Sequence, residues 1–451
     1  MSKEIRFNAF AMNCVGHMAP GLWRHPRDRS ERYTDLNYWT SLARLLERGK
    51  FDGLFLADVL GPYDVYQGRA DAALQSGIQI PVNDPLLLVP GMAAVTEHLG
   101  FGVTCAVTYE HPYSFARRAS TLDHLTKGRF GWNIVSGYLD SAARNFGLDQ
   151  QIQHDDRYAF AEEYVEVCYK LWERSWDHDA VRRDRKSGVF TDPAKVHGIE
   201  HSGEHFKVPG FHLSEPSPQR TPVLYQAGAS RRGTDFAAKH AECVFVSAPT
   251  AAIVQKYVRN LRQRSAELGR GEILIFAMFT IIVAPTEAEA AEKLQEYRSY
   301  VDYEGALALM SGWTGVDLST YDLNEELGLT KTDANQSALE SFTVAEPDRH
   351  WKIREIAEFV GLGGRAPVVV GSPTGVADLL EQWTEETDVD GFNLTYAVMP
   401  ESYEDIIDLL IPELHRRRVY KKEYQPGSLR EKLFGQGPYL PATHPGRRVL
   451  K

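Results

Sequence analysis

Short apolar runs alternate with amphipathic helical patterns from the first residues of the chain to about residue 415. This alternation is typical of a parallel α/β architecture, because each crossover between parallel strands requires a helix. Eight runs have the length and composition of buried strands: residues 5–14, 51–58, 101–110, 130–136, 223–227, 243–247, 273–283 and 391–397. Eight strands with crossover helices favour a closed TIM-type (β/α)8 barrel over an open, doubly wound sheet.

Capping residues mark the helices between these runs. Thr34 precedes an amphipathic segment that Gly49 ends, and Asp84 stands before a proline at the start of another helix. Asp156 opens a segment whose apolar residues step by three and four, as one buried helical face requires.

The chain is longer than a barrel needs. A (β/α)8 barrel requires roughly 250 residues and tolerates long insertions, so we expect one elaborated barrel domain over residues 1–451. The additional segments lie at about residues 61–83, 175–221 and 303–366, with a tail at about 417–451. Insertions after strands gather at the C-terminal face of a barrel. The charged, glycine-rich stretch 172–208 is expected to form a small hairpin that walls the pocket.

Composition restricts the partners and the compartment. The chain has 50 Lys and Arg against 61 Asp and Glu, a formal net charge of -11, which argues against nucleic acid as a ligand. Its four cysteines are scattered without a C-x-x-C pair, which indicates reduced thiols. The longest apolar run, residues 273–284, is too short to span a bilayer. We therefore expect a cytoplasmic protein without a membrane partner.

Polar residues at strand ends are the first candidates for chemistry, since catalytic groups in this fold project from the C-terminal ends of strands. Asp58 ends the second strand and Thr104 lies in the third. Capping of the next turn is the alternative role for such a carboxylate.

Two segments suggest a ligand with a phosphate or an aromatic group. In YQAGASRRG, residues 225–233, a strand passes through small residues into a helix, where Ser230 could cap the helix, bind a phosphate or do both. In HDDRY, residues 154–158, an imidazole, a guanidinium and a phenol fall within one helical turn. A plain αβ loop and a capped helix with Tyr158 as a core anchor are the alternatives.

Two other patterns do not support a cofactor or metal site. Residues 361–366 match G-x-G-x-x-A, but a strand follows the match instead of preceding it, so no dinucleotide site is expected. His197, His201 and His205 recur every four residues, yet glycines interrupt them and no C-x-x-C accompanies them. No metal site is expected there.

Ten collinear segments resemble the flavin monooxygenases related to bacterial luciferase, in the branch that contains long-chain alkane, dimethyl sulfide, nitrilotriacetate and dibenzothiophene sulfone monooxygenases. The resemblance spans about residues 5–440. Its segments are NAFAMNCVGH (8–17), GLWRHP (21–26), LLERGKFDGLFLAD (45–58), IPVNDP (80–85), STLDHLTKGR (120–129), GWNIV (131–135), SAARNFG (141–147), HDDRY (154–158), EPSPQRTPVLYQAG (215–228) and DGFNL (390–394).

The resemblance implies FMN, in its reduced form FMNH2, as the cofactor. It places FMN against residues already singled out and two neighbours: Asp58, Thr104, His154, Tyr158, Ser230, Ser136 and Gly137. The family's FMNH2 reacts with O2 to give a flavin C(4a)-hydroperoxide, which the protein shields from water until it meets the substrate. Because no nicotinamide site is expected, the resemblance also implies a separate NAD(P)H:flavin reductase as partner, and relatives suggest a homodimer or homotetramer.

Five residues are catalytic candidates by the same resemblance. Cys14, His17, Tyr63 and Gln79 match the substrate pocket of the alkane-oxidising relatives, and Tyr138 stands where the alkane enzyme has histidine. A hydroperoxyflavin transfers oxygen more readily to soft sulfur than to an unactivated C–H bond. We therefore favour insertion of one oxygen atom into a small apolar organosulfur compound, with alkane hydroxylation as the alternative.

Two functions of other classes stay open on the sequence alone. A barrel hydrolase could use a carboxylate pair such as Asp58 and Glu110 as acid and base. A non-catalytic barrel could bind flavin without oxidising a substrate.

Overall fold

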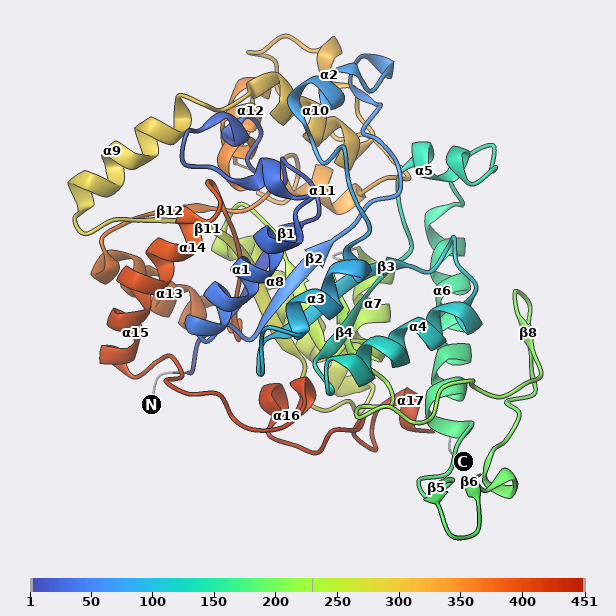
Figure 1. Ribbon diagram of the computed structural model, residues 1–451. Coiled ribbons are helices and arrows are strands. Elements are labelled where there is room, and N and C mark those ends of the chain that lie inside the picture. The colour runs from blue at the N-terminus through green and yellow to red at the C-terminus, as the bar shows by residue number, and fades with distance from the viewer. Residues whose placement is uncertain (1–2, 229, 347, 449–451) are drawn as a thin grey trace.

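The computed structural model describes residues 3–228, 230–346 and 348–448, and at its centre eight parallel strands close into a barrel (Figure 1). In spatial order the strands are β1 (Arg6–Met12), β2 (Gly53–Ala57), β3 (Gly100–Ala106), β4 (Phe130–Val135), β9 (Val223–Gln226), β10 (Cys243–Val246), β11 (Leu274–Val283) and β13 (Gly391–Thr395). The barrel closes because β13 pairs with both β11 and β1, while β10 pairs with β11. The predicted fold class is confirmed.

All eight predicted strands are present. The largest difference in bounds is in the run 101–110, where β3 ends at Ala106. A ninth parallel strand, β12 (Val368–Gly371), extends the sheet outside the barrel, since its first residue pairs with Thr280 in the second half of the long strand β11.

Helices cover the outside of the barrel between successive strands. They are α1 (Leu36–Arg48), α3 (Val89–Ala93), α4 (Pro112–Leu125), α6 (His154–Tyr169), α7 (Arg231–His240), α8 (Ala251–Glu267), α13 (Pro373–Thr387), α14 (Glu401–Asp405) and α15 (Ile411–Arg417). The cap predicted at Thr34 is wrong by one residue, because the Asp35 carboxylate accepts the N–H of Asn37. Helix α6 begins before Asp156, at His154. The predicted cap at Asp84 is confirmed, since its carboxylate accepts the N–H of Leu86.

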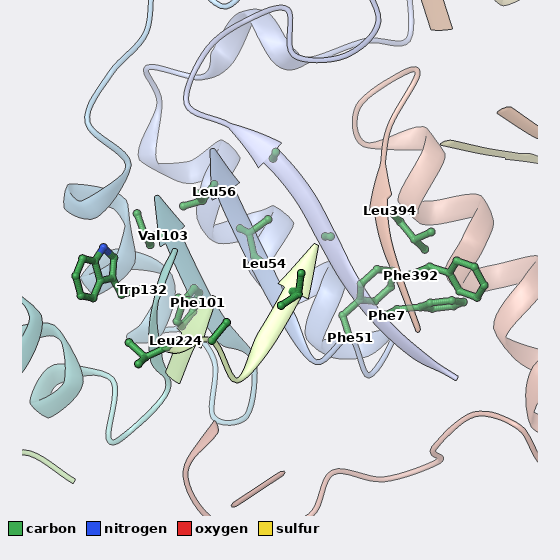
Figure 2. Packing of buried hydrophobic residues seen from close by; sticks show 14 of the residues in the cluster. Phe7, Phe51, Leu54, Leu56, Phe101, Val103, Trp132, Leu224, Phe392 and Leu394 are labelled. Carbon is green, nitrogen blue, oxygen red and sulfur yellow. The ribbon is translucent and has the colours of Figure 1, made fainter. Parts of the chain in front are cut away.

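The alternation of side chains along the strands builds two layers. Phe7, Leu54 and Phe101 belong to the layer between strands and helices and are fully buried. Figure 2 shows part of this layer, where Phe7 lies beside Phe51 and Phe392 with ring centroids 5.8 and 6.4 Å away. Successive residues point to opposite faces of a strand, so a second apolar cluster, rich in Phe, fills the inside of the barrel.

Two of the insertions form a cap at the C-terminal ends of the strands. Residues 61–83 contain α2 (Asp71–Ser76), and residues 303–366 contain α10 (Tyr303–Thr314), α11 (Gln336–Ser341) and α12 (Ile353–Gly363). These helices lie together at the top of Figure 1 and share a hydrophobic cluster separate from that of the barrel helices. The cap therefore covers the end of the barrel where this fold places its ligands.

The third insertion, residues 175–221, lies elsewhere. It contains two hairpins, β5 (Val181–Asp184) with β6 (Val189–Thr191) and β7 (His201–Ser202) with β8 (Lys207–Val208). The expectation that residues 172–208 wall the pocket is wrong, because none of them lines the cavities at the cap end of the barrel. The hairpin of β7 and β8 packs on α6, where Phe206 donates its N–H to Glu163, and β5 and β6 lie at the bottom of Figure 1. The segment follows a helix and precedes a strand, so it leaves the barrel at the opposite end from the cap.

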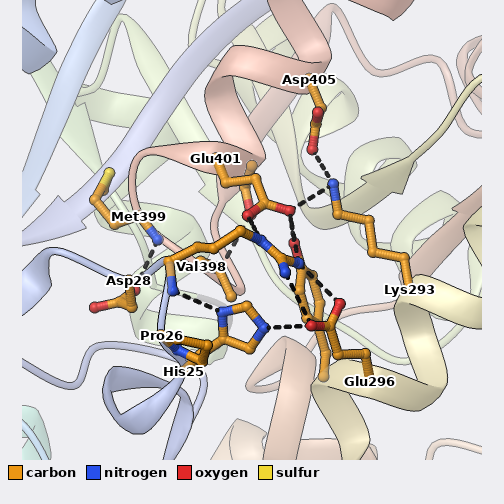
Figure 3. Close-up of polar contacts among 12 residues, drawn as sticks. His25, Pro26, Asp28, Lys293, Glu296, Val398, Met399, Glu401 and Asp405 are labelled. Atoms are coloured by element: carbon orange, nitrogen blue, oxygen red, sulfur yellow. Dashed lines mark hydrogen bonds and ion pairs between the residues drawn. The ribbon is translucent and has the colours of Figure 1, made fainter.

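Ion pairs and hydrogen bonds link the loop after β1 to two helices (Figure 3). Arg27 donates to Glu296 of α9 (Glu287–Arg298) and to Glu401 of α14, while Lys293 pairs with Glu401 at 2.8 Å. Asp28 accepts the backbone N–H of Met399 at 2.7 Å. The loop that leads from β1 to α1 is thereby held against α9, α14 and the segment after β13.

The tail carries α16 (Leu429–Phe434) and α17 (Pro445–Arg448), both at the lower end of the barrel in Figure 1. A search of the described residues finds no helix with the length and apolarity that a bilayer crossing demands.

Candidate functional site

Two adjoining cavities lie at the C-terminal ends of the strands, beneath the cap. The larger, of about 240 Å³, is lined by residues that follow β4 and β9, by the starts of α6 and α7 and by the 303–366 insertion. The smaller, of about 100 Å³, is lined by residues that follow β2, β3 and β4. Val135, Gly137 and Tyr138 line both cavities, so the two form one cleft.

Most of the predicted site residues meet in this cleft. The larger cavity, the smaller one or both are lined by Asp58, Thr104, Ser136, Gly137, Tyr138, His154, Tyr158 and Ser230. These residues lie close together because the strands are parallel, and their C-terminal ends therefore form one rim of the barrel.

Ser230 lies at the start of α7. Its hydroxyl oxygen accepts the N–H of Gly233 at 3.0 Å, so the predicted helix cap is confirmed. Nε2 of His154 lies 3.2 Å from the same oxygen, and the His154 ring meets that of Tyr158 edge to face at 5.2 Å between centroids. The helix N-terminus adds partial positive charge and unpaired N–H groups, which suit a phosphate.

Gly228 packs closely against this cluster. A Cβ atom on Gly228 would lie 2.3 Å from Nε2 of Gln226 and 3.0 Å from the hydroxyl oxygen of Tyr158. The carbonyl of Gly228 accepts the hydroxyl of Tyr257 at 2.6 Å, which fixes the turn. The glycine at position 228 is thus required by close contacts.

Asp58 and Thr104 carry the polar atoms of the smaller cavity. Burial and the charge of Asp84 raise the pKa of Asp58 to about 7. The Thr104 hydroxyl oxygen accepts Nδ2 of Asn133 at 2.9 Å, which leaves its own proton free for a ligand. The remaining lining is largely apolar, with Val59, Leu60 and Ala106 among its members.

A hydrogen-bonded chain leads from the cleft into the cap. The Tyr138 and Tyr63 hydroxyls lie 2.9 Å apart, and the Tyr63 hydroxyl donates to Oε1 of Gln79 at 2.8 Å. Nε2 of Gln79 donates to the carbonyl of His17 at 2.9 Å. Burial raises the pKa of both tyrosines, so both hydroxyls are protonated at neutral pH.

Cys14 and His17 are buried and lie outside the lining of the two cavities. Burial raises the pKa of the Cys14 thiol and lowers the pKa of His17 to about 3, so both side chains are neutral. The His17 ring packs edge to face on Phe10 at 4.5 Å, and neither ring nitrogen has a hydrogen-bond partner among the described residues. Only its backbone carbonyl connects His17 to the cleft, through Gln79.

The carboxylate pair of the hydrolase hypothesis does not form in the cleft. Asp58 lines the smaller cavity, whereas Glu110 is outside the lining and pairs with Arg118. An acid and a base acting on one glycoside must both face it, so this arrangement does not support a hydrolase.

Sequence reasoning missed the part of the cleft that the cap supplies. Asn335 and Arg365 line the larger cavity. Arg365 belongs to the 361–366 segment, whose G-x-G-x-x-A pattern signals no dinucleotide site but does mark a tight turn between α12 and β12.

Comparison with known proteins gives consistent matches over the whole chain. A family model described as luciferase-like monooxygenase matches residues 14–391. The chain is 52% identical to dimethyl-sulfide monooxygenase of Hyphomicrobium sulfonivorans, with 99% of this chain and 93% of that protein covered. It is also 52% identical to long-chain alkane monooxygenase of Geobacillus thermodenitrificans (strain NG80-2), with coverage of 98% and 97%.

A solved structure shares the architecture. A crystal structure of riboflavin lyase, with modified FMN and the substrate riboflavin, superimposes with a TM-score of 0.93 at 36% identity, and both chains are covered completely. This architecture is therefore shared by proteins with different activities.

Proposed function

Because the chain belongs to the luciferase-like monooxygenase family, we propose that it uses reduced FMN to insert one oxygen atom of O2 into a small organosulfur substrate. Bound reduced flavin would supply the chemistry, by activating O2 and passing one oxygen atom to the substrate. The observation that carries the proposal is the junction of the Ser230 helix cap with the Asp58 and Thr104 cavity in a single cleft.

The residues at one end of the cleft fit the phosphate of FMN. Ser230, His154 and Tyr158 offer a hydroxyl, an imidazole and a phenol at the start of α7. A helix N-terminus with such donors favours a dianion. Riboflavin lacks the phosphate and would lose these contacts, which is why we propose FMN.

The other residues of the cleft would hold the ring system and exclude water. Thr104 has a free hydroxyl proton, and Asp58 accepts or donates according to pH around neutrality. Two aromatic side chains, Tyr138 after β4 and Trp313 of the cap, line the larger cavity. A dry enclosure strengthens polar contacts within it and prevents wasteful release of reduced oxygen.

A separate NAD(P)H:flavin reductase would deliver the reduced cofactor. The G-x-G-x-x-A match at residues 361–366 lies at the end of α12 and precedes β12, which is the wrong order for a dinucleotide-binding turn. The reductase is thus proposed as a second protein that reduces FMN and releases it to this chain.

Chemistry favours a sulfur substrate over a long alkyl chain. Soft sulfur takes up an oxygen atom more readily than an unactivated C–H bond does. Equal identity to the dimethyl-sulfide and long-chain alkane enzymes does not separate the two substrate classes, so alkane hydroxylation is the second candidate.

A coupled assay tests the proposal. The purified chain is mixed with FMN, NADH, O2 and a flavin reductase, and dimethyl sulfide and hexadecane are supplied in parallel. We expect consumption of the sulfide and stoichiometric use of O2, both dependent on reductase. Oxidation of hexadecane alone would establish the alkane alternative, and the absence of any substrate-dependent O2 use would contradict both.

A further inference from the structure

Arg365 is a cationic side chain of the larger cavity that carries no charge partner among the described residues. It lines the wall of the cavity next to Trp313, with its guanidinium carbon 5.4 Å from the centroid of the Trp313 ring. No hydrogen bond or ion pair within residues 3–228, 230–346 and 348–448 reaches its guanidinium.

The groups that face Arg365 do not neutralise it. Tyr138 and Tyr63 are the titratable side chains close enough to affect it, and burial keeps both phenols protonated. Asp58, the acidic residue of the smaller cavity, is not among the groups that influence Arg365. Burial itself disfavours the charge, and arginine nevertheless keeps its proton in proteins. Arg365 is half-buried, and a half-buried cation without a partner costs free energy that an anionic ligand would recover.

The backbone turn at Gly364 determines where the Arg365 side chain lies. Gly364 ends α12 with φ at +60°, a left-handed conformation that disfavours residues with a Cβ atom. A Cβ atom at Gly364 would also lie 2.8 Å from Sδ of Met18. The turn reverses the chain into β12 and directs the next residue, Arg365, into the cleft.

We propose that Arg365 makes the cleft selective for the reduced, anionic form of the flavin ring over the oxidised, neutral form. This inference rests on the proposed use of reduced FMN. A reduced isoalloxazine carries a negative charge when N1 has lost its proton, and a nearby cation stabilises that form. Arg365 lies beside Tyr138, the residue at which the larger cavity joins the smaller one, and so on the side toward the ring. The phosphate cradle of Ser230, His154 and Tyr158 lies at the start of α7.

The test compares the dissociation constants of oxidised FMN and of FMN reduced under anaerobic conditions, without any substrate turnover. We expect the wild-type chain to bind reduced FMN more tightly. Arg365→Gln should lower the ratio of the two affinities about tenfold or more, the range of one lost charge-assisted contact. Arg365→Lys keeps the positive charge and should retain most of the preference.

Arg349→Gln is the matched control. Arg349 lies in the same insertion and stacks on Trp351 at 3.7 Å, but it is exposed and outside the cleft. This variant should leave both dissociation constants unchanged, and circular dichroism should show that all three variants fold.

The outcomes separate the inference from the proposed function. An unchanged affinity ratio in Arg365→Gln, or equal weakening of both flavin forms, would overturn the role of Arg365 while the monooxygenase proposal stands. Arg365→Gln can instead be tested with a carboxylated thioether as an anionic substrate probe. Weaker binding of this probe with no change in flavin binding would likewise overturn the role of Arg365 in flavin selectivity and would assign Arg365 to the substrate. A wild-type chain that binds neither form of FMN would overturn both proposals.

Discussion

The hydroxyl of Tyr63 donates to Oε1 of Gln79 at 2.8 Å, and this contact sets the direction of the hydrogen bonds at the edge of the cleft. Nε2 of Gln79 donates to the carbonyl of His17, so Oε1 is the atom that must accept. Since Tyr63 has one proton and gives it to Gln79, it can only accept from Tyr138, 2.9 Å away. Tyr138 then faces the cleft with its oxygen lone pairs, and it can accept a hydrogen bond from a bound ligand.

Tyr63→Phe should therefore destabilise the folded chain and reverse the role of Tyr138. Loss of the hydroxyl leaves the buried Oε1 of Gln79 without its donor, at a cost of about 1 to 3 kcal/mol in the free energy of unfolding. The freed Tyr138 proton can then be donated into the cleft. Urea unfolding measures the first effect.

Tyr138→Phe is the companion variant for the second effect. It removes the group at the cleft and leaves the contact between Tyr63 and Gln79 in place. We expect it to lower coupling of O2 use to substrate oxidation with a smaller loss of stability than Tyr63→Phe. Equal stability losses would contradict the direction of hydrogen bonding derived above.

Ser230→Ala should weaken binding of FMN by about 1 to 3 kcal/mol, because a charge-assisted hydrogen bond to the phosphate is lost. Titration calorimetry with FMN and with riboflavin checks the source of the effect, since riboflavin has no phosphate and its affinity should change little.

Ser372→Ala is a closely matched control for the loss of a helix cap. Ser372 starts α13 with φ -68° and ψ 163°, against -67° and 163° for Ser230, and each accepts the N–H of a glycine three residues on. Both variants should lose about 1 kcal/mol of stability. Only Ser230→Ala should lose FMN affinity, and equal losses of affinity would assign Ser230 a purely structural role.

Much of the barrel could be predicted because its strands are uniformly apolar and regularly spaced. The cap residue at Thr34 was misplaced because Thr34 and Asp35 are adjacent and both cap well, so local sequence does not choose between them. The cluster of His154, Tyr158 and Ser230 could be predicted, since each lies at a strand end or helix start that the fold brings to one rim.

The path of the insertions could not be derived from periodicity. The composition of residues 172–208 suggests a place at the pocket. Their position after α6 instead directs them to the far end of the barrel. Arg365 was missed for the related reason that its place depends on how α10 and α12 pack as a cap. Such packing depends on tertiary contacts between distant segments, and local pattern does not report them.

Asp58→Asn should change how stability depends on pH. The folded chain raises the pKa of Asp58 from its usual 3.8 to about 7, so between these values the folded state holds a proton that the unfolded state has lost. The free energy of unfolding therefore falls as pH rises through this window. Asparagine is neutral throughout, and we expect the variant to gain stability over wild type between pH 5 and pH 7.5, by on the order of 2 kcal/mol.

Asp84→Asn provides the second arm of that experiment. The charge of Asp84 contributes to the raised pKa of Asp58, and asparagine can still cap the turn that starts at Pro85. The fall in the free energy of unfolding between pH 5 and pH 7.5 should be smaller in this variant than in wild type. Urea unfolding at pH 5 and pH 7.5 without flavin measures the free energy of unfolding of all three proteins. An identical change with pH in wild type and in both variants would contradict the raised pKa of Asp58.

Gly312→Ala should be strongly destabilising, although alanine is the better helix former by about 1 kcal/mol. A Cβ atom at this position of α10 would lie 1.9 Å from Cδ1 of Tyr63. The Tyr63 ring is 2% exposed and held by hydrogen bonds to Gln79 and Tyr138, so it cannot move aside freely. Overpacking of this kind costs about 1 to 3 kcal/mol, and displacement of Tyr63 would add the loss of both hydrogen bonds.

Gly328→Ala is the control within the same insertion, since a Cβ atom there meets no atom within 4 Å. Its free energy of unfolding should stay within about 0.5 kcal/mol of wild type. Gly312→Ala should also lower the yield of oxidised substrate per O2, because the ring that it displaces orients Tyr138 at the cleft. If Gly312→Ala unfolds at the wild-type urea concentration, α10 can shift away from Tyr63 without cost, and the rigid cap inferred from this contact is wrong.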